Sequence, residues 1–466
     1  MIYLSIIFFS SVILSTGLIL SRKSFFKLAE NTLGLLNTLL DSNEDELIKQ
    51  KALIRGLTKL LSSLFKFILF IGLTVALAVL PTLAFISFDT SAFKDLDFRS
   101  VGFYAVLIIG SLVPFVIFSF QKPKGDYSEW SVLLHKIILN NYNISKYLFS
   151  VEKGLFRRKT RELKNDFWII SGLARSGTTA LTTLLFRSDK FHSLSYANVP
   201  FLLTPNLWRL FYRPSNARLK ERSHGDKVMI GHNTVEALEE FFFKAFLLDS
   251  FVKKDTLIAH DIDDDTYRNY LIYQNLLKPS RKPDSTYIAK NNNFLLRYQS
   301  IRKFNPDFKV FFLFRDPVNH AHSLLKQHQR FSKFQKEDPF TLEYMNWLGH
   351  HEFGLNLKSF KFPSSKITDD HPPESINYWL ISWINYYSHI LEIMHDENVF
   401  LIHYSDFLQT PEKLIASLSA ITNLKINIDQ IAPFKNTNHY SGEVDIGLQD
   451  QAQAIFNQLV ARKVVV

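Results

Sequence analysis

FWIISGLARSGTTALTTLLF, residues 167–186, is the stretch that most constrains the fold. Its apolar start, residues 167–173, predicts a buried strand, and Thr178 to Phe186 predicts a helix. Between them, Gly172 and Gly177 have the G-x-x-x-x-G spacing of a P-loop. Such a loop wraps an anion with backbone N–H groups and directs a helix N-terminus at it. The stretch therefore predicts an anion site where a strand ends.

The same loop differs from the P-loop of nucleoside triphosphatases in where its basic residue lies. Thr178 stands where an ATPase has its lysine, and a basic residue, Arg175, lies inside the loop instead. The loop is thus suited to a phosphate-like group but poorly equipped for Mg-dependent γ-phosphoryl transfer. A glycine turn capped by Ser and Thr is the structural alternative.

Further along the chain, strand and helix patterns alternate. KVFFLFR (309–315) and NVFLIHY (398–404) read as buried strands, followed by helical patterns over 318–329 and 411–421. This alternation predicts an α/β fold, a three-layer P-loop-like domain with a central parallel sheet.

A second anion motif follows the strand at 309–315. Arg315 ends that strand, and Ser323 lies in the helix after it. An Arg fork and a Ser hydroxyl together chelate one phosphate. An Arg315–Asp316 pair at the strand end is the structural alternative.

Upstream of these motifs the chain contains three apolar runs, at 2–20, 64–86 and 101–120. Each is about twenty residues, the length of a membrane-spanning helix. We expect a membrane region over 1–124 and a catalytic domain over 125–466, with the boundary near KPKGDYSEW. A cleaved signal peptide is the alternative for the first run. Residues 44–62 fit either an interfacial helix or a hairpin partner.

Lysines and arginines follow the first and third runs, whereas few lie between the second and third. The positive-inside rule then places the N-terminus outside and the catalytic domain in the cytoplasm. The 466 residues carry a formal net charge of +10 and include no cysteine, which excludes disulfides, thiolate metal sites and cysteine nucleophiles. The basic residues cluster near membrane ends and in the anion motifs, so a nucleic-acid partner is not favoured.

SGLARSGTTAL (171–181) and FLFRDPVNHAHSL (312–324) resemble the two nucleotide-binding motifs of sulfotransferases that use 3'-phosphoadenosine 5'-phosphosulfate (PAPS), in their bacterial and Golgi-type, carbohydrate-like branch. Segments 286–309 and 397–424 also resemble that family, and the likeness covers roughly residues 165–440. It implies PAPS as co-substrate, with no metal required. The 3'-phosphate would be bound by Arg315 and Ser323, and the 5'-phosphosulfate by the loop residues Arg175, Ser176, Gly177, Thr178 and Thr179. Arg175 would also stabilise the leaving group.

The chain departs from the cytosolic members of that family, because Arg175 replaces their loop lysine and their Lys-Thr-His base motif is missing. SHGD (223–226) and HNTVEALEEFFFKAF (232–246) resemble an acidic segment that lies after the loop helix in bacterial members of the family. For the general base we therefore expect Glu236 first and Glu240 second, four residues apart on one helical face. A solvated face of an amphipathic helix is their alternative.

Several other polar residues are weaker candidates. His224 and His232 are further possible bases, and His351 is the fallback. LGHHEFG (348–354) is a candidate lining of the acceptor pocket, and KNTNHYSGEV (435–444) a loop near the nucleotide. Lys290, Asn292 and Asn293 fit contacts with the sulfuryl group or acceptor, or ordinary loop solvation.

The sequence thus predicts sulfuryl transfer to a hydroxyl of a carbohydrate, glycolipid or other membrane-associated acceptor. Two other functions stay open: a membrane-bound P-loop kinase or NTPase, and a non-catalytic nucleotide-binding membrane protein.

Overall fold

The computed structural model describes residues 2–40, 46–88, 100–119, 129–160, 163–212, 220–221, 229–230, 234–363, 365, 371–428, 440 and 442–465. The chain divides into two compact units, the first ending at Ile137 and the second beginning at Ile138. The predicted boundary at 124/125 lies outside the described residues.

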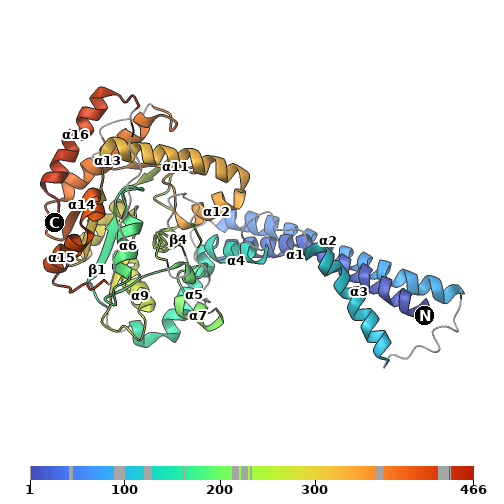
Figure 1. Ribbon diagram of the computed structural model, residues 1–466. Coiled ribbons are helices and arrows are strands. Elements are labelled where there is room, and N and C mark those ends of the chain that lie inside the picture. Colours follow the sequence, from blue (N-terminus) through green and yellow to red (C-terminus); the bar gives the residue numbers. More distant parts are fainter. Residues whose placement is uncertain are drawn as a thin grey trace. The chain divides into compact units, whose positions relative to one another are not determined.

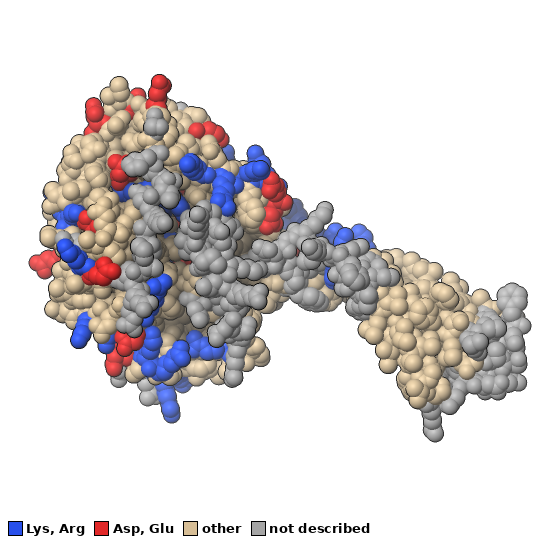
Figure 2. Space-filling view, in the orientation of Figure 1, with Lys and Arg blue, Asp and Glu red and all other residues tan. Residues whose placement is uncertain are grey.

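The first unit is built on three apolar helices, α1 (Ile2–Leu40), α2 (Glu46–Phe88) and α3 (Val101–Ser119). Helix α1 packs against both of the others (Figure 1). By length and composition, Tyr3–Leu36 and Lys49–Ala84 are able to cross a membrane, and Val101–Pro114 is a shorter apolar helix. In Figure 2, part of the described surface of this unit is tan and shows no Lys, Arg, Asp or Glu residue.

Two of these helices are longer than the predicted runs. Helix α1 continues past the first apolar run, through the basic stretch after residue 20, to Leu40, because Lys and Arg interrupt the apolar run without disfavouring the helix. Residues 46–62 form the start of α2 and act as the hairpin partner of α1, with Asn31 Nδ2 donating to the Lys59 carbonyl oxygen at 3.5 Å.

A five-stranded parallel sheet organises the second unit. The strand order is β2-β6-β1-β7-β9, and the strands are β2 (Phe191–His192), β6 (Thr286–Lys290), β1 (Phe167–Ser171), β7 (Lys309–Phe314) and β9 (Val399–His403). In β1, Ile169 is paired with Ala289 of β6 on one side and Val310 of β7 on the other. The parallel sheet and its three predicted strands are confirmed.

Helices cover both faces of this sheet, as in the predicted three-layer fold (Figure 1). On one face Trp168 and Ile170 pack in one core with residues of α6 (Thr178–Phe186) and α15 (Pro411–Thr422). On the other, Phe167 and Ile169 pack with residues of α9 (Asp264–Leu277) and α13 (Ile376–Ile393). Every side chain of β1 is buried, as expected for a strand covered on both faces.

Further helices, 3-10 turns and short strands complete the described residues. The helices are α4 (Glu129–Leu139), α5 (Tyr142–Leu155), α7 (Pro205–Phe211), α8 (Glu240–Leu247), α10 (Tyr298–Phe304), α11 (Pro317–Glu337), α12 (Pro339–Leu348), α14 (Tyr404–Gln409) and α16 (Ile446–Ala461). Short 3-10 turns occur at Arg157–Thr160, Tyr196–Asn198 and Phe294–Arg297. Strand β3 (Lys220–Glu221) pairs with β4 (Met229–Ile230), and β5 (Thr256–Ile258) with β8 (Ser359–Lys361).

Candidate active site

The P-loop-like turn joins β1 to α6 at the carboxyl edge of the sheet. Gly172 (φ +143°), Arg175 (φ +70°) and Gly177 (φ +99°) all have positive φ. A Cβ on Gly172 would lie 2.6 Å from the Leu313 carbonyl oxygen of β7, and one on Gly177 would lie 2.6 Å from the Tyr404 ring. Both glycines are therefore required by backbone conformation and by close approach.

The start of α6 supplies the rest of the predicted loop site. Helix α6 begins at Thr178, as predicted, and Ser176, Thr178 and Thr179 are buried. The first turn of a helix has backbone N–H groups without helical partners, which suits an anion.

His320, on α11, holds the loop from the neighbouring element. Its Nε2 lies 2.7 Å from the Ala174 carbonyl oxygen. Burial, with the charges of Arg315 and Arg175, lowers the pKa of His320 to about 3, so the ring is neutral and Nε2–H donates. The sequence interpretation missed this role, because nothing in the local pattern tells which way a histidine on a helix faces.

The two predicted anion motifs come together. Strand β7 lies beside β1, so Arg315, at the end of β7, faces the same edge as the loop. Arg175 Nε donates to Ser323 Oγ at 3.4 Å, which joins the loop to α11. Burial and the nearby charge of Arg175 lower the pKa of Arg315. Two neighbouring guanidinium groups at one edge of the sheet are chemically suited to binding a polyanion.

Asp316 has a local structural task. Its Oδ1 accepts a hydrogen bond from the Asn319 backbone N at 2.8 Å and so caps α11. The guanidinium carbon of Arg315 lies 5.0 Å from the centre of the Tyr404 ring.

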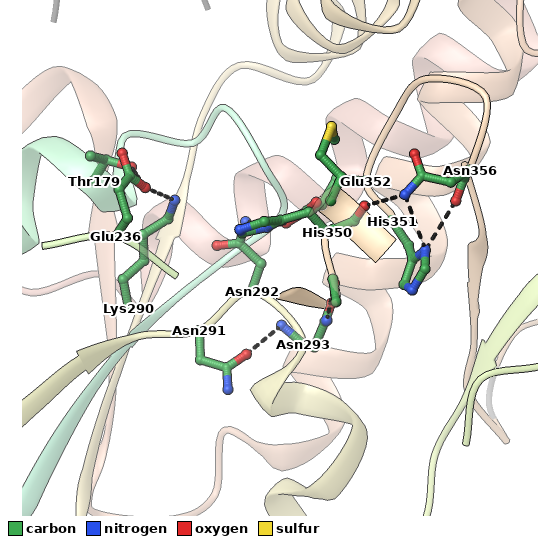
Figure 3. Close-up of polar contacts among 12 residues, drawn as sticks. Thr179, Glu236, Lys290, Asn291, Asn292, Asn293, His350, His351, Glu352 and Asn356 are labelled. Carbon is green, nitrogen blue, oxygen red and sulfur yellow. Dashed lines mark hydrogen bonds and ion pairs between the residues drawn. The ribbon is translucent and has the colours of Figure 1, made fainter. Parts of the chain in front are cut away.

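Glu236 reaches the first turn of α6. Its Oε2 accepts from Lys290 Nζ at 3.1 Å and from Thr179 Oγ1 at 3.5 Å (Figure 3). Lys290 ends β6, the other neighbour of β1, so this carboxylate lies at the same sheet edge as the loop. Glu236 is buried, so its interpretation as a solvated position is wrong.

The expectation that Glu236 and Glu240 share a helical face is also wrong. Helix α8 begins only at Glu240, and Glu236 lies in the non-helical segment before it. Glu240 is buried too, and its two oxygens accept from Arg297 Nη1 and Nη2 at 2.7 Å each. Both oxygens of Glu240 are therefore engaged in a buried ion pair, which makes it part of the core.

Between these two carboxylates lies Glu239, which the sequence interpretation did not single out. Its side chain accepts from Tyr270 OH (2.5 Å), Tyr287 OH (3.0 Å) and Asn291 Nδ2 (2.9 Å). Burial raises the pKa of Glu239 and those hydrogen bonds act against the rise. This network holds Asn291, the residue after Lys290, in place.

A second polar cluster adjoins Lys290. Asn292 Nδ2 donates to Glu352 Oε1 at 3.1 Å, and His350 Nδ1 lies 3.6 Å from the same oxygen (Figure 3). Lys290, Asn292 and Asn293 are all buried, so their interpretation as a solvated loop is wrong.

His351, the fallback base, is engaged elsewhere. It is buried, and its Nδ1 lies 3.1 Å from the Asn356 carbonyl oxygen. Burial lowers the pKa of His351 to about 3. In Figure 3 its ring lies on the far side of His350 from Glu236.

The structure describes only some of the remaining residues that the sequence predicts for the site. His224, His232 and most of 435–444 lie outside the described residues. Tyr440 is described, and its backbone N donates to Asn319 Oδ1 at 2.9 Å, beside the helix that carries Ser323. Within the described ranges, no three His, Asp or Glu side chains converge as metal ligands.

Comparison with known proteins gives a family. The model of a family described as the sulfotransferase domain matches residues 164–441, more than half of the chain. A search of curated proteins gave no match.

Solved structures of sulfotransferases are also similar. One from Mycobacterium tuberculosis H37Rv shares 11% identity at a TM-score of 0.41, covering 76% of this chain and 88% of its own. One from Mycobacterium avium shares 12% identity at a TM-score of 0.38, covering 76% and 81%. Because both TM-scores are below 0.5, the family assignment rests on the match to the family model and not on these structures.

Proposed function

The chain belongs to the sulfotransferase domain family, and from this premise we propose that it transfers a sulfuryl group from PAPS to a hydroxyl of a carbohydrate, glycolipid or other membrane-associated acceptor. The observation that carries the proposal is the convergence of Arg175, Arg315 and Ser323 at the edge where β1 and β7 end. Glu236 lies at the first turn of the helix that follows the loop.

The loop and its helix bind the 5'-phosphosulfate in this proposal. Residues 175–179 supply backbone N–H groups and hydroxyls, and Arg175 offsets the charge that develops on the bridging oxygen as the S–O bond breaks. Arg315 and Ser323 bind the 3'-phosphate. No residue of this set requires a divalent metal.

Glu236 is the general base in this proposal. It removes the proton of the acceptor hydroxyl as the oxygen attacks sulfur, which contributes about 10²–10⁴-fold to the rate. Lys290, 3.1 Å from Glu236, holds this carboxylate at the end of β6 and favours its ionised, proton-accepting form.

The N-terminal helices anchor the enzyme in a membrane, with the catalytic unit in the cytoplasm. Support comes from the apolar surface of α2, where Phe65, Leu69 and Leu73 are exposed, and from the lysines and arginines that follow the first and third apolar runs. Reporters fused after residue 125 and near Asp95 test this topology, and an external readout for the first contradicts it.

A transfer assay tests the activity. Purified full-length protein is incubated with PAPS labelled in its sulfur and a glycolipid extract of the cells that make it. We expect PAP release matched by labelled lipid, and mass spectrometry then identifies the acceptor. ATP hydrolysis without transfer from PAPS would instead favour a P-loop kinase or NTPase.

A further inference from the structure

A buried polar cluster lies next to the proposed base. Asn292 stands between the Glu236–Lys290 pair and the carboxylate of Glu352 (Figure 3). Its Nδ2 donates to Glu352 Oε1 at 3.1 Å, while Asn293 Nδ2 donates to the Gly349 carbonyl oxygen at 3.1 Å. The cluster thus joins the loop after β6 to the segment after α12.

Two acceptor atoms of this cluster have no protein donor. The Oδ1 atoms of Asn292 and Asn293 are buried and lack a hydrogen-bond partner among the described residues. The two residues are 4% and 3% exposed. Burying an amide oxygen without a hydrogen-bond donor costs free energy. Each of these two atoms is therefore expected to accept a hydrogen bond from a ligand or an ordered water.

The third acceptor is the Glu352 carboxylate. Burial acts to raise its pKa, but the charge and hydrogen bond of His350 and the charge of Lys290 outweigh burial and lower it to about 2. At neutral pH this group therefore accepts hydrogen bonds and does not donate. A ligand of the cluster must supply several donors.

The surrounding charges narrow the ligand class. A carboxylate or phosphate would be repelled by the negative charge of Glu352, and Lys290 already offsets that charge, so no ammonium group is needed there. Neutral hydroxyl groups satisfy all three acceptors. A single phenolic hydroxyl leaves at least one of them without a donor.

We propose that Asn292, Asn293 and Glu352 form an acceptor subsite that binds neighbouring hydroxyls of a neutral polyhydroxyl group such as a sugar ring. This subsite rests on the proposed function, because it holds the ring whose other hydroxyl reaches Glu236. It makes the acceptor a glycan or glycolipid.

Binding in the presence of PAP tests the subsite without requiring turnover. The full-length protein is placed in phospholipid nanodiscs, and PAP affinity is measured first by calorimetry. With PAP bound, myo-inositol and cyclohexanol, the same ring with a single hydroxyl, are titrated by saturation-transfer NMR. The variants are Glu352→Gln and Asn292→Ala, and Glu337→Gln, at an exposed position on α11, is the control.

We expect wild type to bind myo-inositol, and Glu352→Gln to weaken that binding roughly ten- to a hundredfold. Asn292→Ala should weaken it less, and the control should match wild type. PAP affinity and the cyclohexanol signal should not change. If Glu352→Gln has a lowered melting temperature, Asn292→Ala, which removes another acceptor of the subsite, carries the comparison.

Two results overturn the subsite while leaving sulfuryl transfer intact. One is a wild-type protein that binds PAP but not myo-inositol, which means that water alone fills the cluster. The other is unchanged myo-inositol binding in well-folded variants. A wild type that fails to bind PAP counts instead against the proposed function itself.

Discussion

Glu236→Gln and Glu240→Gln are matched substitutions of neighbouring carboxylates, and we expect them to fail in opposite ways. Glu240→Gln should lower stability and leave turnover of the folded protein nearly intact. Glu236→Gln should abolish most turnover and leave the fold intact. The reason is that Glu240 is bound at both oxygens within the core, whereas Glu236 lies at the start of α6.

The magnitude for Glu240 follows from its partner. The side chains of Arg297 and Glu240 are 0% and 3% exposed, and the guanidinium carbon lies 4.1 Å from the centre of the Phe243 ring. Removing one partner of such a buried pair costs about 3–5 kcal/mol. At ~2 °C per kcal/mol for a large domain, the melting temperature should fall by roughly 6–10 °C. Gln retains one acceptor oxygen, so the lower end is expected.

Glu236→Gln should cost less stability. Its amide oxygen still accepts from Lys290 Nζ, and the charge of Glu352 acts on the same lysine. Turnover should nevertheless fall about 10²–10⁴-fold, because an amide removes no proton.

Both variants are measured by thermal melting, PAP calorimetry and sulfur transfer from PAPS to the glycolipid extract, assayed well below the lowered melting temperature. PAP affinity should match wild type in each. The reasoning is refuted if Glu236→Gln turns over normally, or if Glu240→Gln melts like wild type yet is inactive, in which case Glu240 is the base.

Three further outcomes follow from the site and the core. Arg315→Ala should weaken PAP about ten- to a hundredfold and leave adenosine 5'-phosphosulfate, which lacks the 3'-phosphate, unaffected in calorimetry; equal losses for both ligands would remove the 3'-phosphate assignment. PAP binding should be the same with and without EDTA, and its loss on chelation would contradict a metal-free site. The melting temperature should fall between pH 7 and pH 5, because burial lowers the pKa of four histidines to about 3; a flat profile would contradict their burial as neutral rings. These histidines are His192, His260, His320 and His351. A pKa lowered on folding contributes stability that is complete above the unfolded value of ~6.5 and is lost as pH falls toward 3, about 2 kcal/mol for each ring by pH 5.

Sequence reasoning succeeded where a contiguous pattern carries the structure. The strand, glycine turn and helix at 167–186 are close neighbours in the chain, and only glycine tolerates the backbone that the turn adopts at Gly172 and Gly177. Arg315 and Ser323 stand out in the sequence for the same reason, since both lie within one strand–helix unit, and their binding of the 3'-phosphate stays a prediction. The short strand β2 was missed, because two residues carry no period.

The sequence by itself determined the parallel α/β domain, the loop and the Arg–Ser motif, because local backbone preference and hydrophobic period encode them. Only the tertiary structure decided which acidic residue contacts the helix turn that follows the loop. Glu236, Glu239 and Glu240 are nearly adjacent in the chain, yet they contact Lys290, Asn291 and Arg297 respectively. Those partners lie on and just after β6, a strand whose place beside β1 depends on non-local pairing. The carboxylates therefore differ through contacts between distant segments, which no local pattern records.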